Sequence, residues 1–188
     1  MHITPHIDYV KLASAEKYYG AEGFDIIEVP WIVPYSPYIS LRPPNINRRE
    51  FYTLDGYLNA SGETSFLTLM QGGVILRKNA CVTACFRDEE VIDETHYKYF
   101  MKLELIDTDV STENLNNMIA SAQRHLNQYC PTKVVATNEG VQTYDIVDER
   151  FGIEVGSYGV REVDGFRWIY GTGIALPRLD VVIEKYRK

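Results

Sequence analysis

The sequence is poor in the residues that build disulfide frameworks and zinc sites. It contains three cysteines and four histidines in 188 residues. Cys81, Cys85 and Cys130 leave one thiol over in any disulfide pairing, and no second Cys/His pair stands at zinc-finger spacing from the first two. No apolar run approaches the roughly 18 residues of a membrane span, and no secretory signal core precedes the first cysteine. We therefore expect a cytoplasmic protein with no membrane partner.

The sequence also has fewer positively charged than negatively charged residues. Lysine and arginine total 19 against 26 aspartates and glutamates, a net charge of -7 at pH 7, and the pI is near 5.1. Broad affinity for nucleic acids comes mainly from lysine and arginine contacts to phosphates, so this balance argues against it. What is present is ordinary for a globular protein, with 45% apolar and 24% charged residues. We expect one compact domain over residues 1–188.

Glycine and proline mark the predicted ends of helices and strands in the first third of the chain. A helix is predicted up to Tyr19 and ends at the glycines that follow. Residues 24–33 predict a strand, in which Pro30 favours an edge, a bulge or a subunit interface because it cannot donate a ladder hydrogen bond. A proline-rich connector over 34–44 comes next. A short helix is then predicted over 65–71, stopped by two glycines.

Two segments in the middle of the chain predict an antiparallel pair of strands. Residues 79–88 and 97–106 both have extended character, and an acidic loop of about ten residues separates them. Side chains alternate between the two faces of a strand. Phe100 and Glu104 should therefore share one face of the second strand with the lysine between them, and Arg87 should end the first.

The clearest helix pattern lies over residues 112–129. Apolar residues recur there on one helical stripe, at Leu115, Met118, Ile119, Ala122, Leu126 and Tyr129. Further strands are predicted over 134–137, 143–147, 152–157 and 166–170, and a final helix over 174–186. Strands in antiparallel runs, with helices between the groups, indicate an α+β fold in which an antiparallel β-sheet is flanked by helices.

Arg87, Phe100 and Glu104 have side chains suited to a nucleotide and an amine. A guanidinium offers forked donors to a phosphate, and a phenyl ring can stack on a base. The carboxylate of Glu104 would point into the same cavity, where it would receive an ammonium group. The alternatives are a salt-bridged arginine, a core phenylalanine and a glutamate ion-paired on a half-exposed sheet.

Two further segments offer ligands for a polyphosphate. Glu154 is a carboxylate on an otherwise apolar strand, and oxygen ligands suit magnesium, although a solvent-facing glutamate is the alternative. If a helix follows the turn Gly171–Gly173, its amides would face an anion, with Arg178 in the first turns. The pattern lacks the Lys-Ser/Thr ending of a P-loop and the third glycine of a dinucleotide fingerprint.

In this order, the segments resemble the three motifs of class II aminoacyl-tRNA synthetases. Gly23–Pro30 resembles motif 1, which builds the dimer interface of that family. Phe86–Glu89, the acidic loop and Phe100–Glu104 resemble motif 2, the most specific of the three, and Gly171–Arg178 resembles motif 3. Residues 144–161 are similar to the segment before motif 3 in the aspartate, asparagine and lysine enzymes. The resemblance spans most of the chain and implies the class II synthetase-like core fold.

For ATP, the resemblance implies one role for each residue. It implies that Arg87 contacts the α-phosphate, that Phe100 stacks on adenine and that Arg178 holds the γ-phosphate. Glu89 would lie near the adenine, and Glu154 would hold magnesium at the phosphates. Arg87 and Arg178 are thus the implied catalytic residues, and ATP and Mg²⁺ the implied cofactors.

For the amino acid, the resemblance implies that Glu104 receives the ammonium group and that Ser157 also binds the substrate. Arg161 matches an arginine that reads the substrate side chain in the aspartate and asparagine enzymes, which favours an acidic substrate. The alternative is that Arg161 pairs with a neighbouring acid such as Glu162 or Asp164.

Some features depart from the family pattern. Pro177 stands where motif 3 usually has a polar or acidic residue, and the Ser-Pro-Gln segment that helps to hold the amino acid has no clean counterpart, although residues 62–65 lie nearby. We expect no anticodon-binding domain beside the core, and the acidic balance argues against tRNA binding. A stand-alone core of this kind is similar to synthetase-like proteins that activate an amino acid for another acceptor, such as ammonia-dependent asparagine synthetase.

The expected function is therefore ATP- and magnesium-dependent activation of an amino acid through an aminoacyl adenylate. The motif 1 resemblance adds a homodimer to this expectation. Two alternatives stay open: a synthetase paralogue that binds ATP or an amino acid without chemistry and regulates a partner, and aminoacyl transfer to a nucleic acid.

Overall fold

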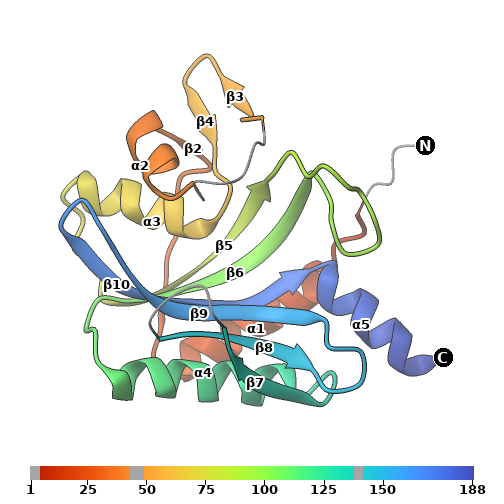
Figure 1. The fold of residues 1–188 in the computed structure, drawn as a ribbon. Coiled ribbons are helices and arrows are strands. Elements are labelled where there is room, and N and C mark those ends of the chain that lie inside the picture. Colours follow the sequence, from red (N-terminus) through yellow and green to blue (C-terminus); the bar gives the residue numbers. More distant parts are fainter. Residues whose placement is uncertain (1–4, 43–48, 138–141) are drawn as a thin grey trace.

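A seven-stranded sheet forms the centre of the protein in a computed structural model that describes residues 5–42, 49–137 and 142–188 (Figure 1). Across the sheet the strands are β1 (Asp25–Ile26), β5 (Lys78–Phe86), β6 (Tyr99–Asp107), β10 (Phe166–Leu176), β9 (Glu154–Val163), β8 (Thr143–Asp148) and β7 (Thr132–Ala136). β1 runs parallel to β5, and the other neighbouring pairs are antiparallel. The predicted α+β class, with an antiparallel sheet flanked by helices, is confirmed.

Helices cover both faces of this sheet. On one face lie α1 (Tyr9–Ala21), α4 (Thr112–Leu126) and α5 (Arg178–Arg187). On the other lies α3 (Gly62–Gln71), which also contacts α2 (Tyr35–Ser40). A small sheet packs beside them, formed by β2 (Ile32–Val33), β4 (Gly56–Leu58) and β3 (Tyr52–Thr53). Within the described residues, no helix is both long enough and apolar enough to cross a membrane.

The core is divided by the sheet into two apolar clusters. The larger lies under α1, α4 and α5 and includes Tyr19, Leu103, Leu105, Leu115, Tyr158 and Ile169. The smaller lies under α3 and includes Phe66, Leu67, Met70, Ile106 and Trp168. Along β6, alternate residues such as Leu103 and Leu105 enter the larger cluster, whereas Ile106 on the other face enters the smaller one.

The predicted helix over 112–129 is present as α4, which ends at Leu126, so the stripe from Leu115 to Leu126 is buried against the sheet, whereas Tyr129 lies beyond the helix and is partly buried. Ser111 caps the start of α4, and the Ser111 side chain accepts a hydrogen bond from the amide of Asn114 at 3.0 Å. The predicted helices before Tyr19 and over 65–71 are also present, although α3 begins earlier, after the cap residue Ser61.

The strand predicted over 24–33 is wrong for most of its length. Only its two ends are extended, as β1 and β2, and they belong to different sheets. Between them, the carbonyl of Pro30 accepts a 2.6 Å hydrogen bond from the Ser65 hydroxyl on α3. The segment therefore crosses from the edge of the main sheet to the small sheet, with α3 holding its midpoint. The proline-rich connector contains the unpredicted helix α2, and its residues 43–48 lie outside the described part of the chain.

The start of the final helix differs from the prediction. Gly171–Gly173 lie inside β10, which continues to Leu176, and α5 begins at Arg178. A Cβ atom on Gly171 would lie 2.7 Å from the sulfur of Met118, and one on Gly173 would lie 2.5 Å from a methyl of Leu103. These glycines permit close packing of the sheet core, so the anion-binding turn predicted there is wrong.

Candidate functional site

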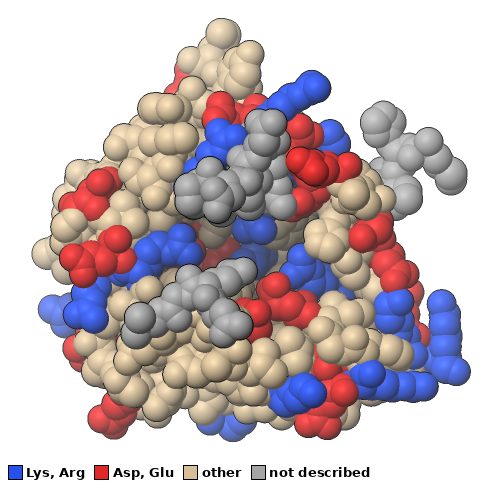
Figure 2. All heavy atoms as spheres, viewed as in Figure 1, with Lys and Arg blue, Asp and Glu red and all other residues tan. Residues whose placement is uncertain are grey.

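Two adjoining cavities lie on the α3 face of the sheet. One holds about 360 Å³ and the other about 110 Å³. Four residues line both of them: Arg87, Lys102, Glu154 and Thr172. Figure 2 shows this part of the surface as a central hollow where basic and acidic side chains meet. The shared lining makes the two cavities neighbouring compartments of one site.

The strand register places the polar residues on the cavity face. β5 and β6 pair without a break, so that Phe100 lies opposite Cys85, Lys102 opposite Thr83, and Glu104 opposite Cys81. Thr172 of β10 lies opposite Glu104 on its other side. Residues directly opposite each other in an antiparallel pair point to the same face. The predicted shared face of Phe100, Lys102 and Glu104 is therefore confirmed.

The smaller cavity gathers the five residues that the sequence suggested for a nucleotide: Arg87, Glu89, Phe100, Glu154 and Arg178. The guanidinium carbon of Arg87 lies 5.1 Å from the centre of the Phe100 ring. Its Nε donates a 2.9 Å hydrogen bond to the carbonyl of Ala60. The guanidinium is thus held on one side by a hydrogen bond, and Arg87 and Phe100 both line the smaller cavity.

Arg178 and Glu154 meet across the smaller cavity. An Nη atom of Arg178 lies 3.3 Å from a carboxylate oxygen of Glu154, and about a quarter of the arginine side chain is exposed. Glu154 stands at the first position of β9, and Arg178 at the first position of α5. The start of a strand and the start of a helix thus bring together two charges that are 24 positions apart in the sequence.

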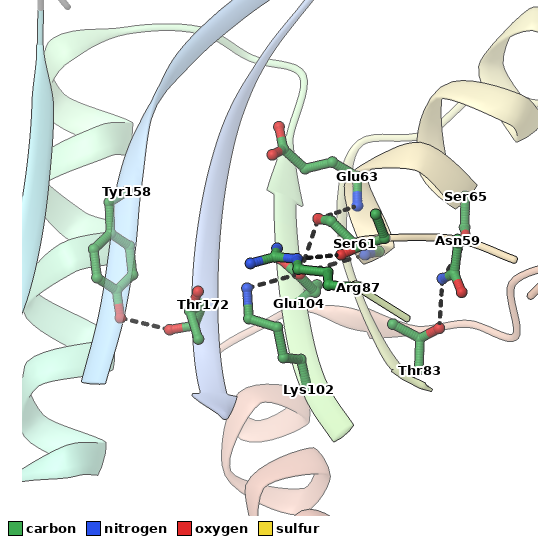
Figure 3. Close-up of polar contacts among 12 residues, drawn as sticks. Asn59, Ser61, Glu63, Ser65, Thr83, Arg87, Lys102, Glu104, Tyr158 and Thr172 are labelled. Atoms are coloured by element: carbon green, nitrogen blue, oxygen red, sulfur yellow. Dashed lines mark hydrogen bonds and ion pairs between the residues drawn. The ribbon is translucent and has the colours of Figure 1, made fainter. Parts of the chain in front are cut away.

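Glu104 is a buried carboxylate at the base of the larger cavity (Figure 3). Three donors converge on its Oε1: the Lys102 ammonium at 2.9 Å, the Ser61 hydroxyl at 3.1 Å and the Gly62 amide at 3.3 Å. The amide belongs to the first turn of α3, where the helix dipole also favours a negative charge. These charge-assisted hydrogen bonds offset the cost of burying the carboxylate.

Glycine at position 62 is required by this arrangement. A Cβ atom there would lie 2.7 Å from Cγ and 2.9 Å from Cβ of Glu104. A neighbouring network positions the same helix: the buried amide of Asn59 donates to Ser65 Oγ at 3.1 Å and to Thr83 Oγ1 at 3.0 Å (Figure 3). The loop before α3, the helix itself and β5 are thereby joined beside the site.

An ion pair that the sequence did not predict lines another part of the larger cavity. Glu63 accepts a 2.9 Å hydrogen bond from the indole N–H of Trp168, and the same oxygen lies 3.3 Å from Nε of Arg161. The guanidinium carbon of Arg161 lies 4.8 Å from the centre of the Tyr170 ring. Burial raises the pKa of the Glu63 carboxyl, while the charge of Arg161 acts in the opposite direction.

The partner of Arg161 is therefore neither of the neighbouring acids considered from the sequence. Glu162 instead lies 3.9 Å from Arg167, and Asp164 accepts hydrogen bonds from Ser40 and Gln71. Glu63 is 98 positions away from Arg161, so sequence proximity offered no sign of the pair. The only local sign was its place in the segment 62–65, near the position where the resemblance to the aspartate enzyme would have put the missing Ser-Pro-Gln segment.

All the residues predicted for the amino acid line the larger cavity: Glu104, Ser157 and Arg161. Ser157 lies on β9, opposite Asp145 of β8.

Among the described residues, no group of three or more His, Cys, Asp and Glu side chains is placed to hold a metal ion. A divalent cation here would have to take most of its ligands from a bound phosphate chain and from water.

No protein-family model and no curated protein matches the sequence. Solved structures do match the fold. A pyrrolysyl-tRNA synthetase from Desulfitobacterium hafniense superposes with a TM-score of 0.73 at 18% identity, covering 94% of this chain and 69% of that one. A second structure of this synthetase gives the same score and identity, covering 67% of its chain.

A more distant match is a cytoplasmic serine-tRNA ligase from Naegleria fowleri, in complex with AMP. It superposes with a TM-score of 0.70 at 16% identity, covering 95% of this chain and 48% of that one. At these identities the likeness establishes the fold alone, which is that of the class II aminoacyl-tRNA synthetase catalytic core. The narrower resemblance to the aspartate, asparagine and lysine enzymes stays a prediction.

Proposed function

We propose that this protein is an ATP- and magnesium-dependent ligase that activates an amino acid as an aminoacyl adenylate for transfer to a further acceptor. One observation carries the proposal. On the cavity face of a class II synthetase fold, the residues expected for ATP line one cavity and those expected for an amino acid line its neighbour, with Arg87 and Lys102 in both. Adenylation requires the two substrates to meet in this way.

For the nucleotide, we assign adenine to the Phe100 ring and the α-phosphate to Arg87. Glu89 lies in the same cavity, near the expected adenine, and Arg178 would take the γ-phosphate at the opposite end. The motivating geometry is the guanidinium of Arg87, which lies beside the Phe100 ring and is oriented by the Ala60 carbonyl. A fixed guanidinium stabilises charge that develops on a phosphate without further reorganisation.

Glu154 is the residue that fits a magnesium ion. It is an oxygen ligand, 45% exposed, at the cavity that would hold the phosphates. Magnesium commonly binds through one or two carboxylates together with substrate phosphates, so a single glutamate suffices. When bound, the ion would neutralise phosphate charge. Arg178, which now pairs with Glu154, would be released to a phosphate oxygen.

For the amino acid, we assign the ammonium group to Glu104 and the side chain to the part of the cavity lined by Ser157 and Arg161. The substrate carboxylate would then attack the α-phosphorus, and the bond from that phosphorus to the bridging oxygen would break to release pyrophosphate. No protein nucleophile is needed, because positioning and charge neutralisation supply the catalysis. The resemblance favours an acidic side chain through Arg161, but Glu63 already neutralises that guanidinium.

The test is pyrophosphate exchange into ATP, measured for each amino acid in turn. The intact protein should exchange with at least one of them, and Arg87→Met or Arg178→Met should reduce the rate by about 100-fold or more. Arg167→Met is the matched control, since Arg167 is 58% exposed and pairs only loosely with Glu162; it should stay within about twofold of the original rate. Binding of ATP without exchange for any amino acid would refute adenylation.

A second candidate is a synthetase paralogue that binds a ligand and regulates a partner without chemistry. The direct Arg178–Glu154 pair favours it, because the two groups expected to hold the triphosphate and its metal neutralise each other. Calorimetry separates the two candidates. Heat from amino-acid binding, with no pyrophosphate released in the presence of ATP and magnesium, would support the regulator.

A further inference from the structure

Glu63 and Arg161 form a closely matched pair of opposite charges inside the larger cavity. Their 3.3 Å contact leaves this part of the cavity with no net charge. Glu63 is buried, and about a third of the Arg161 side chain is exposed. A ligand that reaches this place therefore meets a carboxylate and a guanidinium together.

The pair is held in place by its surroundings. The indole N–H of Trp168 fixes the carboxylate of Glu63, and the Tyr170 ring supports the guanidinium of Arg161. Tyr170 reaches across β9 because residue 159 is glycine, where a Cβ atom would lie 2.8 Å from the Tyr170 hydroxyl. Groups fixed in this way are preorganised to bind a ligand, because little side-chain freedom is lost on binding.

We propose that this pair selects an amino acid whose side chain is uncharged and carries both a hydrogen-bond donor and an acceptor. This inference rests on the amino-acid site proposed above. A carboxamide has both: its NH₂ group would donate to Glu63, and its carbonyl would accept from Arg161. We name this pair of residues the Glu63–Arg161 subsite.

Charged and apolar side chains fit the Glu63–Arg161 subsite less well. An acidic side chain would place a second carboxylate beside buried Glu63, and a basic one would place a second cation beside Arg161, which is unfavourable where water is scarce. An apolar side chain of similar shape would displace water from Glu63 and Arg161 without offering a hydrogen bond to either. Sites built to hydrogen-bond a substrate reject the analogue that lacks the polar group far more strongly than pockets that merely fit it.

The test is calorimetric binding of free amino acids to the intact protein, so that it does not depend on catalysis. Asparagine and glutamine are compared with aspartate, glutamate and the apolar isostere leucine. At least one carboxamide should bind about tenfold or more tightly than each of the other three. Tighter or equal binding of aspartate or glutamate would overturn the inference while leaving the proposed function intact.

The substitution Glu63→Gln makes the test sharper. The glutamine carbonyl can still accept from Trp168, but Arg161 loses its counter-charge, so the preference should shift toward the acidic amino acids by about tenfold or more. Glu162→Gln is the matched control, because Glu162 is 70% exposed and faces Arg167; it should leave the preference unchanged. An unchanged preference in Glu63→Gln would contradict the assignment.

A second variant keeps the inference testable if Glu63→Gln does not fold. Arg161→Gln leaves the carboxylate of Glu63 unbalanced and should favour lysine or ornithine at the expense of the carboxamides. Circular dichroism would establish that each variant is folded. If the intact protein binds none of the amino acids, the proposed function fails together with this inference.

Discussion

At the scale of single residues, His125 on α4 is the clearest case of a polar side chain outside the site that is buried at a cost. It is 1% exposed, and neither ring nitrogen has a hydrogen-bond partner among the described residues. Its ring stacks on Tyr18 with 4.7 Å between centroids, and it meets the Tyr129 ring edge to face with 5.5 Å between centroids. Burial lowers the pKa of His125 to about 4, so the ring is neutral in the folded protein.

This residue predicts that stability falls in mild acid. The unfolded chain binds a proton at His125 near pH 6.5, whereas the folded chain does so only near pH 4. The stability that depends on a neutral His125 is therefore fully present above pH 6.5 and is lost as the pH falls toward 4. Between pH 7 and pH 5 this loss amounts to about 2 kcal/mol of unfolding free energy. His125→Phe should lessen the pH-dependent loss by that amount in urea unfolding at the two pH values.

His6→Phe is the control for this experiment, because His6 is exposed near the start of the described chain. It should lose as much stability between pH 7 and pH 5 as the original protein. An equal pH-dependent loss in His125→Phe would show that other groups cause the acid sensitivity.

At the scale of elements, the contact between the first turn of α3 and β6 is the most constrained part of the site. Gly62→Ala would bring a Cβ atom within 2.7 Å of Glu104 and force the helix and the strand apart. We expect a loss of about 1–3 kcal/mol in unfolding free energy and weaker amino-acid binding, because Glu104 would lose the Ser61 and Gly62 donors. Urea unfolding and calorimetry measure the two effects.

Gly20→Ala provides the matched comparison. Gly20 lies in the last turn of α1, and a Cβ atom there would meet no atom within 4 Å. Alanine is favoured over glycine in a helix, so this variant should gain about 0.5–1 kcal/mol. If both variants gained stability, the close approach of α3 to Glu104 would be refuted.

How far the sequence predicts these elements depends on how local each signal is. The apolar spacing of α4 and the alternation along β5 and β6 are local patterns, and both predictions were confirmed. The junction of β10 and α5 was missed because Gly171 and Gly173 are needed for packing against distant side chains and form no turn. Likewise, α2 and the small sheet depend on contacts with α3, which short-range patterns do not report.

The candidate site divides in the same way. Phe100 and Glu104 lie on β6, and Arg87 directly follows the neighbouring strand β5, so alternation along β6 suffices to place two of the three on a common face. Glu63 and Arg161 meet only because α3 packs against the main sheet, so their ion pair needed the tertiary structure.

At the scale of the whole molecule, the sheet has two open edges of different character. β1 forms one edge, with Ile26 41% exposed, and Trp31 and Ile32, 45% and 42% exposed, come directly after the motif 1-like segment. β7 forms the other edge. Exposed apolar groups beside an open strand edge support the proposed homodimer through the motif 1-like segment.

This proposal predicts a dimer at micromolar concentration in light scattering. Ile26→Asp should raise the dissociation constant by about tenfold or more, because twofold symmetry would bring the new charge into the interface twice. Val134→Asp is the control, since Val134 is 38% exposed on β7 at the opposite edge. A monomeric original protein, or equal dissociation of both variants, would exclude this interface.

Strand β6 sets the distance between the expected base and ammonium positions, as well as the face of the sheet on which they lie. Phe100, Lys102 and Glu104 are successive cavity-facing residues of a strand whose pairing with β5 is unbroken. At about 3.3 Å per residue, the expected base and ammonium positions are separated by about 13 Å of backbone, with the lysine halfway. Because cavity-facing positions recur at every second residue, the distance between the base position and the ammonium position can change only in steps of two residues. Inserting one residue between Phe100 and Glu104 would turn one of them into the apolar core, so the site cannot be lengthened gradually.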